Sequence, residues 1–264
     1  MNVDQTAADL AAEHKALDAV LAQIDEDAWS IPTSSPEWTV ADQVGHLAYY
    51  DQAATTAILD PAAFGAMRDE LFKSATSLKA VDDMTLASFR RMSGSSLLEA
   101  WRDHRAALLD AVSGLDNSDR VEWYGPSMSA RSFVTARLME TWTHGRDALD
   151  ALNVRVEPTD RLWHIARLGV VTRSWSYQNR QLDPPVGDVF VSLTAPSGIV
   201  WTFGDAAADD QVEGDAEEFC LVVTQRRHLD DTDLIASPGA RDWLTKAQAF
   251  AGPATDGPAA GTRV

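Results

Sequence analysis

The chain is poor in thiols and in positive charge. Its 264 residues include a single cysteine, Cys220, which excludes an internal disulfide and a zinc site made of four thiolates. Lys and Arg number 22 against 40 Asp and Glu, so the formal net charge is −18. Because nucleic acids and anionic membrane surfaces attract basic proteins, this balance argues against either as a partner.

Long apolar runs are also missing. No stretch approaches the roughly 18 consecutive apolar residues that a membrane-spanning helix needs. The first residues lack the basic segment and apolar core of a signal peptide, so we expect a cytoplasmic protein. The sequence contains no glycine-rich phosphate loop, no Gly-x-Ser-x-Gly elbow and no Cys-x-x-Cys pair, which leaves the chemistries of those motifs without support.

The residues that are abundant favour a helical first part. Hydrophobic residues make up 45% of the chain, enough for a sizeable core. Apolar residues recur at three- and four-residue spacings, and Thr39 followed by Asp42 has the pattern of a helix N-cap. We predict that residues 1–182 form a helical bundle, with helices over about 5–25, 39–60, 61–79, 85–113, 129–152 and 160–180.

The pattern changes at residue 183, where two prolines precede alternating apolar residues. Strands are predicted over 189–194 and 199–203 with a turn between them, and a third short strand near 211–213. Helices are expected over about 215–226 and 239–250. We therefore predict an α+β chain: the bundle, a small α+β domain over 183–251, and a disordered Gly- and Pro-rich tail over 252–264.

A stripe of polar residues lies on the predicted helix over 129–152. Arg137, Glu140, His144 and Asp147 follow one another at spacings of three and four, which places them on one helical face. Glu140 and His144 are able to bind one divalent metal ion together, and His46 on another apolar helix is the best third ligand. The alternative is a surface Glu–His contact and a histidine that is hydrogen-bonded in the core.

Residues near these candidate ligands suggest supporting roles. Asp42, one turn before His46, and Asp147, one turn after His144, are acceptors for the second N–H of each imidazole. Arg137 is placed to orient the Glu140 carboxylate or to bind an anionic substrate. The alternative for Asp147 is an ordinary charge on the helix surface.

The remaining histidines carry weaker signals. His14 and His104 lie among charged residues, which predicts surface positions, whereas His164 beside a tryptophan is a core candidate. His228 at the end of a helical segment is explained as a cation near a helix C-terminus. Cys220, among apolar residues, is expected to be buried.

Two motifs resemble those of a known superfamily. The segment from Trp38 to His46 resembles the first metal motif of the DinB-like helical bundle superfamily, and Arg137-x-x-Glu140-x-x-x-His144-x-x-Asp147 resembles the second. The arrangement is most similar to the mycothiol-dependent maleylpyruvate isomerase family of actinobacteria. The resemblance covers most of the chain and implies a DinB-like up-down four-helix bundle followed by a small α+β domain.

The resemblance also implies roles for individual residues. It makes His46, Glu140 and His144 the ligands of a metal, with Zn²⁺ as the expected ion. Arg226 matches an arginine that faces the active site in the family, and Arg227 follows it, so both are candidate contacts of a mycothiol cofactor. The sequence departs from the family at Gln225, where the residue before that arginine is usually glycine. We expect Arg137, Asp147 and Arg226 to be the catalytic residues.

Three functions follow as hypotheses. The leading one is a metal-dependent enzyme that uses a low-molecular-weight thiol such as mycothiol, as an isomerase or thiol transferase on a small carboxylate-bearing substrate. The second is a metal-dependent hydrolase, in which the open metal position carries hydroxide. The third is a non-catalytic metal-binding accessory or regulatory protein. The expected partners are a small-molecule substrate and a thiol, and the expected assembly is a monomer or homodimer.

Overall fold

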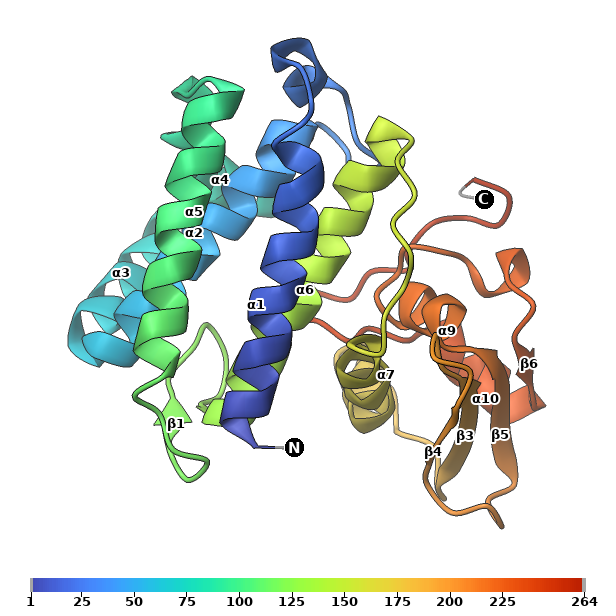
Figure 1. Cartoon of the computed structure of the whole chain (residues 1–264). Helices are drawn as coiled ribbons and strands as arrows, with labels where there is room; N and C mark the ends of the chain where they lie inside the picture. Colours follow the sequence, from blue (N-terminus) through green and yellow to red (C-terminus); the bar gives the residue numbers. More distant parts are fainter. Residues whose placement is uncertain (1, 263–264) are drawn as a thin grey trace. The chain divides into compact units, whose positions relative to one another are not determined.

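A computed structural model gives the structure of the chain and describes residues 2–262. The chain divides into two compact units, Met1–Val156 and Glu157–Val264 (Figure 1). The helices over 162–178 belong to the second unit because they pack on its other helices, whereas we expected the boundary at residue 182. In the part of the chain that the structure describes, no helix has both the length and the hydrophobicity to cross a bilayer.

The first unit is mostly helical. One short antiparallel hairpin, β1 (Arg120–Val121) with β2 (Met128–Ser129), precedes its last helix. Its elements are α1 (Val3–Leu21), a 3₁₀ turn (Glu26–Ser30), α2 (Val40–Leu59), α3 (Pro61–Ser74), α4 (Leu78–Leu86), a second 3₁₀ turn (Phe89–Arg91), α5 (Gly94–Val112), β1 (Arg120–Val121), β2 (Met128–Ser129) and α6 (Ala130–Leu152).

Four long helices form the predicted bundle. The helix α2 packs on α5 and α6, and α1 packs on the same two helices, so the four enclose one core (Figure 1). Leu17, Leu47 and Trp101 are among the fully or almost fully buried residues of that core. The bundle matters for the site because its core holds α2 against α6 along the faces that carry His46 and Glu140.

Local signals set where these helices begin. The Thr39 side chain accepts from the Asp42 backbone N–H and the Asp42 side chain accepts from Thr39, which is the capping box that we predicted at the start of α2. The predicted helix over 85–113 is instead interrupted after Leu86. Ser93 caps a new helix there, and Gly94 lies so close to the Trp29 ring that a Cβ atom would come within 2.1 Å of it.

The second unit is a small α+β domain, as predicted. Its sheet has the strand order β4-β3-β5-β6, with β3 parallel to β5 and antiparallel to β4, and β6 antiparallel to β5. The predicted single helix over 160–180 is divided at Thr172. The elements are α7 (Leu162–Val171), α8 (Arg173–Gln178), β3 (Val189–Thr194), β4 (Val200–Phe203), β5 (Asp210–Asp215), α9 (Ala216–Val223), a 3₁₀ turn (Leu229–Asp231), β6 (Ile235–Ala236) and α10 (Pro238–Leu244).

The described part of the C-terminal tail, residues 252–262, contains neither helix nor strand but is hydrogen-bonded to the second unit. Gln225 Nε2 donates to the Thr255 carbonyl (2.7 Å), and the Thr255 hydroxyl donates to Gln225 Oε1 (2.6 Å). The Gly261 N–H donates to the Asp231 carboxylate (2.8 Å). The predicted disorder of residues 252–264 stays a prediction, and residues 263–264 lie outside the described part of the chain.

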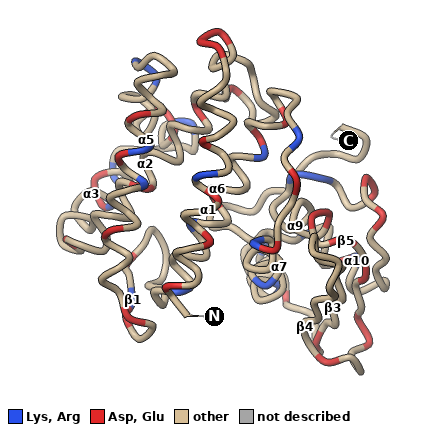
Figure 2. Tube along the Cα trace, in the orientation of Figure 1, with Lys and Arg blue, Asp and Glu red and all other residues tan. Residues whose placement is uncertain are grey.

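The negative charge is not gathered in one element. Figure 2 shows Asp and Glu along most helices and loops of both units, with Lys and Arg interspersed among them. A net charge of −18 spread in this way is explained by solubility and does not by itself indicate a binding surface.

Candidate metal centre

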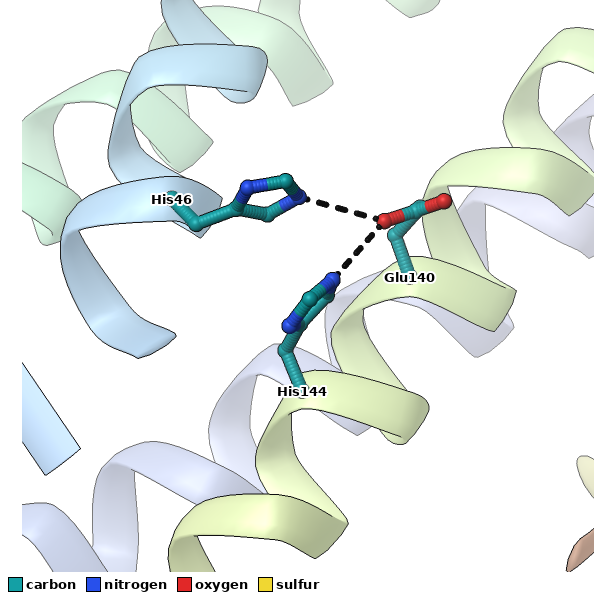
Figure 3. Close-up of side chains that lie close together, drawn as sticks. All are labelled: His46, Glu140 and His144. Atoms are coloured by element: carbon teal, nitrogen blue, oxygen red, sulfur yellow. Dashed lines mark hydrogen bonds and ion pairs between the residues drawn. The ribbon is translucent and has the colours of Figure 1, made fainter. Parts of the chain in front are cut away.

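Two neighbouring helices of the bundle bring three candidate ligands together. His46 comes from α2, and Glu140 and His144 come from α6, one turn apart (Figure 3). His46 Nε2 lies 3.3 Å and His144 Nε2 lies 3.1 Å from the same carboxylate oxygen, Glu140 Oε2. One ligand atom from each residue falls within 4.8 Å of the other two.

The spacing of these atoms fits a divalent metal ion. Donors bound tetrahedrally at zinc–ligand distances of about 2.0–2.1 Å lie about 3.3 Å from one another. The observed separations of 3.1 and 3.3 Å are close to that value before any rearrangement. The three side chains are 13–24% exposed, so the centre is not sealed from solvent. Two imidazoles and a carboxylate suit zinc, and three protein ligands leave a position for another group.

The protonation states also suit metal binding. Burial, with a smaller contribution from His144, lowers the pKa of His46 to about 4, so its imidazole is neutral at pH 7. Burial raises the pKa of Glu140, but the hydrogen bonds from His144 and His46 outweigh that effect and hold it well below its usual value. A neutral imidazole and an ionised carboxylate are the forms that coordinate a metal.

Gln43, which the sequence analysis missed, holds one of the imidazoles. Its Oε1 lies 2.6 Å from His144 Nδ1, while its Nε2 donates to the hydroxyls of Thr33 (2.9 Å) and Ser35 (3.1 Å). Because the amide oxygen accepts, His144 Nδ1 carries a proton, and Nε2 is the nitrogen that would be left to coordinate a metal ion. In the sequence, the one sign of this role is that Gln43 lies three residues before His46 on the same helix.

The two aspartates expected to accept from the imidazoles make other contacts. Asp42 caps its own helix and accepts from Arg90 Nε (2.7 Å), and its predicted support of His46 stays a prediction. Asp147 is buried at 1% exposure and lies 3.4 Å from the hydroxyls of Ser34 and Ser35. Gln43 reaches His144 Nδ1 from the facing helix, and the predicted support of His144 by Asp147 stays a prediction.

Arg137 pairs with a buried carboxylate on α2. Its Nε and Nη2 donate to Asp51 Oδ1 (3.2 and 2.9 Å), and the two side chains are 3% and 0% exposed. Trp101 Nε1 on α5 donates to the other oxygen of Asp51 (3.1 Å). Arg137 therefore joins α6 to α2 beside the centre. Its predicted contacts with Glu140 or a substrate carboxylate stay predictions.

His14 belongs to the same buried group, so the predicted surface position is wrong. It is 2% exposed, its Nε2 lies 3.7 Å from Asp51 Oδ2, and its ring packs edge-on against Trp101. Burial lowers its pKa to about 4, opposed by Asp51 and assisted by Arg105 and Arg137. His14 is neutral at pH 7, so its contact with Asp51 is not an ion pair there.

The second unit contains Arg226 and Arg227. Both follow α9, and their guanidinium groups donate to the main-chain carbonyls of Thr224 (2.8 Å) and Arg226 (2.9 Å), respectively. Gln225, just before them, has a φ of 61°, the left-handed conformation that glycine adopts most readily. The backbone thus has the shape that a glycine would favour at this position, although the sequence has glutamine.

Removing the Gln43 acceptor is expected to weaken metal binding. Gln43→Leu should lower the affinity for zinc by about 10- to 100-fold, because the orientation and tautomer of His144 lose their support. Competition with a chromophoric chelator measures this affinity. Gln52→Leu, an exposed position on the same helix, is the matched control and should bind as the unaltered protein does. Equal affinity in both variants would show that Gln43 does not position His144.

The sequence is similar to a known family and to two curated proteins. A family model described as "Mycothiol maleylpyruvate isomerase N-terminal domain" matches residues 10–149. Two proteins of Mycobacterium tuberculosis, from strains CDC 1551 and H37Rv and each named only as uncharacterized, are 44% identical over 249 residues, which cover 93% of this chain and 95% of theirs.

Solved structures show the same fold. Two crystal structures of the mycothiol-dependent maleylpyruvate isomerase, one of them of a histidine-to-alanine mutant, match with TM-scores of 0.58 and 0.59. The sequence identity is 15% and 16%, and the matches cover 90% of this chain and 94% of each of those chains. Since the family model spans more than half of the chain, the protein belongs to the mycothiol maleylpyruvate isomerase family.

Proposed function

We propose that this protein is a cytoplasmic, zinc-dependent enzyme that uses a low-molecular-weight thiol such as mycothiol. The reaction is an isomerisation or thiol transfer on a small, carboxylate-bearing substrate. The observation that carries the proposal is the convergence of His46, Glu140 and His144 in a partly exposed centre. Membership of the family supports the thiol, and the name of the solved isomerases supports the reaction class.

Several residues of the chain have separate roles in this proposal. When bound, zinc would favour the thiolate over the thiol and so supply a nucleophile at neutral pH. Gln43 keeps the His144 Nε2 lone pair directed at the centre, and the ionised Glu140 provides its negative charge. Arg137, paired with Asp51, holds the two ligand-bearing helices together.

The chemistry follows from addition to a double bond. A thiolate that adds to an activated C=C bond leaves a single bond that rotates, and loss of the same thiolate then restores the double bond in the other geometry. Uptake of a proton at the neighbouring carbon instead gives the thiol adduct. A cation that binds the substrate carboxylate favours addition, and we propose Arg226 for this role, with Arg227 as a contact of the thiol. Asp147 stays a candidate for positioning the α6 ligands.

Metal analysis and a thiol-dependent assay test the proposal together. Protein purified without chelator should hold about one zinc per chain, and the His46→Ala, His144→Ala double variant should hold none. Turnover of maleylpyruvate should require added mycothiol and be lost in the double variant. His228→Ala, in the second unit, is the control and should keep its metal.

Different outcomes separate the hypotheses. Full metal occupancy in the double variant would overturn the assignment of the ligands. Metal-dependent turnover of an ester or amide without any thiol would favour the hydrolase. Bound metal with a closed, four-ligand shell and no turnover would favour the accessory protein, whose metal serves stability.

A further inference from the structure

The indole of Trp38 lies against both candidate metal-binding imidazoles. Its ring is nearly parallel to that of His144, with an interplanar angle of 24° and centroids 5.8 Å apart. It is tilted by 49° against His46, at 5.2 Å. One aromatic ring therefore contacts the ligands from both helices, α2 and α6.

The loop that carries Trp38 is folded tightly before α2. The Thr33 N–H donates to the Trp38 carbonyl (2.8 Å), and the Trp38 N–H donates to the Ser35 carbonyl (3.1 Å). The loop ends at the capping box of α2, which fixes the position of Trp38 relative to His46 two turns later. These hydrogen bonds hold the backbone of Trp38 in place.

A third element holds the indole itself. Trp38 Nε1 donates to Asp82 Oδ2 on α4 (3.1 Å), and burial raises the pKa of that carboxyl. An indole N–H has no acceptor capacity, so this bond defines which edge of the ring faces α4 and which face lies against the imidazoles.

A cavity of about 240 Å³ lies beyond the indole. Trp38 and Asp82 belong to its lining, together with Pro36, Glu37, Lys79, Asp83 and Arg90. None of the three candidate ligands lines it. Its charged side chains are already paired with one another, as Lys79 with Glu37 (3.0 Å) and Arg90 with Asp83 (3.0 Å). We therefore assign no ligand to the cavity. Its importance is that the Trp38 indole separates it from the candidate metal ligands.

We propose that Trp38, held by Asp82, is a positioning residue that fixes the two imidazoles and closes the metal centre on the side of this cavity. The inference rests on the proposed function for the presence of a metal. A flat apolar ring keeps water from one side of the centre and limits rotation of both imidazoles. Without it, the ligands reorient more freely and the metal is released faster.

Four variants separate the ring from its hydrogen bond. Trp38→Ala should lower zinc affinity by about 10- to 100-fold, as expected for loss of an outer contact of metal ligands. Trp38→Phe keeps a ring and loses the donor, and Asp82→Ala loses the acceptor, so each should lower affinity by about fivefold. The Trp38→Phe, Asp82→Ala double variant should be no weaker than either single variant, because both remove one bond.

The measurements use the full chain and four readouts. Chelator competition gives zinc affinity, and stopped-flow transfer to a chelator gives the release rate. The visible absorption of the cobalt-loaded protein reports on ligand geometry, and its bands should shift in Trp38→Ala. In metal-free protein, Asp82→Ala should move the indole N–H resonance that Trp38→Phe removes. Trp175→Ala, at an exposed tryptophan of the second unit, is the matched control.

The outcomes distinguish this inference from the proposed function. If the unaltered protein binds neither zinc nor cobalt, the proposed function fails and the inference with it. If it binds both and Trp38→Ala matches it in affinity, release rate and cobalt spectrum, the inference is overturned while the metal centre stands. An indole resonance that does not respond to Asp82→Ala would overturn the role of that carboxylate. Trp38→Phe covers the case in which Trp38→Ala does not fold.

Discussion

Arg137→Met should lower the free energy of unfolding by about 3–5 kcal/mol, because it leaves the Asp51 carboxylate buried without its counterion. The two side chains are 3% and 0% exposed, and both donor nitrogens of Arg137 contact one oxygen of Asp51. Urea unfolding of the metal-free protein, followed by circular dichroism, measures the change. A methionine of similar length keeps most of the apolar packing, so the loss reports on the charge.

A double variant identifies the cause. Asp51→Leu combined with Arg137→Met removes both charges, and its unfolding free energy should recover toward that of the unaltered protein. The recovery should be incomplete, because the Trp101 N–H then loses its acceptor. Arg155→Met, at an exposed arginine of the same unit, is the control and should change stability by less than about 0.5 kcal/mol. A single variant that is as stable as this control would contradict the assignment.

His14 should make the protein less stable in acid. Burial lowers its pKa from 6.5 to about 4, so between these values the unfolded chain binds a proton that the folded chain does not. Stability therefore falls as the pH drops through 6.5 and levels off below about 4. The loss at pH 4 from this one group is about 3 kcal/mol.

The comparison with His14→Leu isolates this effect. Urea unfolding of both metal-free proteins at several pH values between 4 and 7 gives two curves, and groups that titrate alike in both cancel in their difference. The variant should lose about 3 kcal/mol less than the unaltered protein over this range. Parallel curves would show that His14 does not stay neutral inside the bundle.

The periodic part of the sequence predicted most of the fold. Three- and four-residue spacings located the bundle helices, and the alternation after residue 183 located the sheet of the second unit. The breaks were harder to predict. The helix over 85–113 is interrupted because Ser93 caps a new start and Gly94 must pass the Trp29 ring, a contact between distant segments that no local pattern reveals.

Supporting contacts of the centre were the least predictable. Asp42 and Gln43 are neighbours in sequence and point about 100° apart around the helix. Asp42 faces its own N-terminus and Arg90, whereas Gln43 faces His144 on α6. To predict which of the two contacts His144, one must know how α2 is rotated about its axis relative to α6. The positions of the apolar residues on α2 define that rotation only approximately.

The sequence by itself determined that Glu140 and His144 share one face, because the helical repeat places residues four apart above one another. It also placed His46 on an apolar helix that had to enter the core. Only the tertiary structure decided that the His46 and His144 imidazoles approach one oxygen of Glu140. The same holds for the ion pair between Arg137 and Asp51 and for the packing of the Trp38 ring against both imidazoles. These contacts join segments far apart in the chain, and they depend on how packed side chains set the rotation and spacing of α2 against α6.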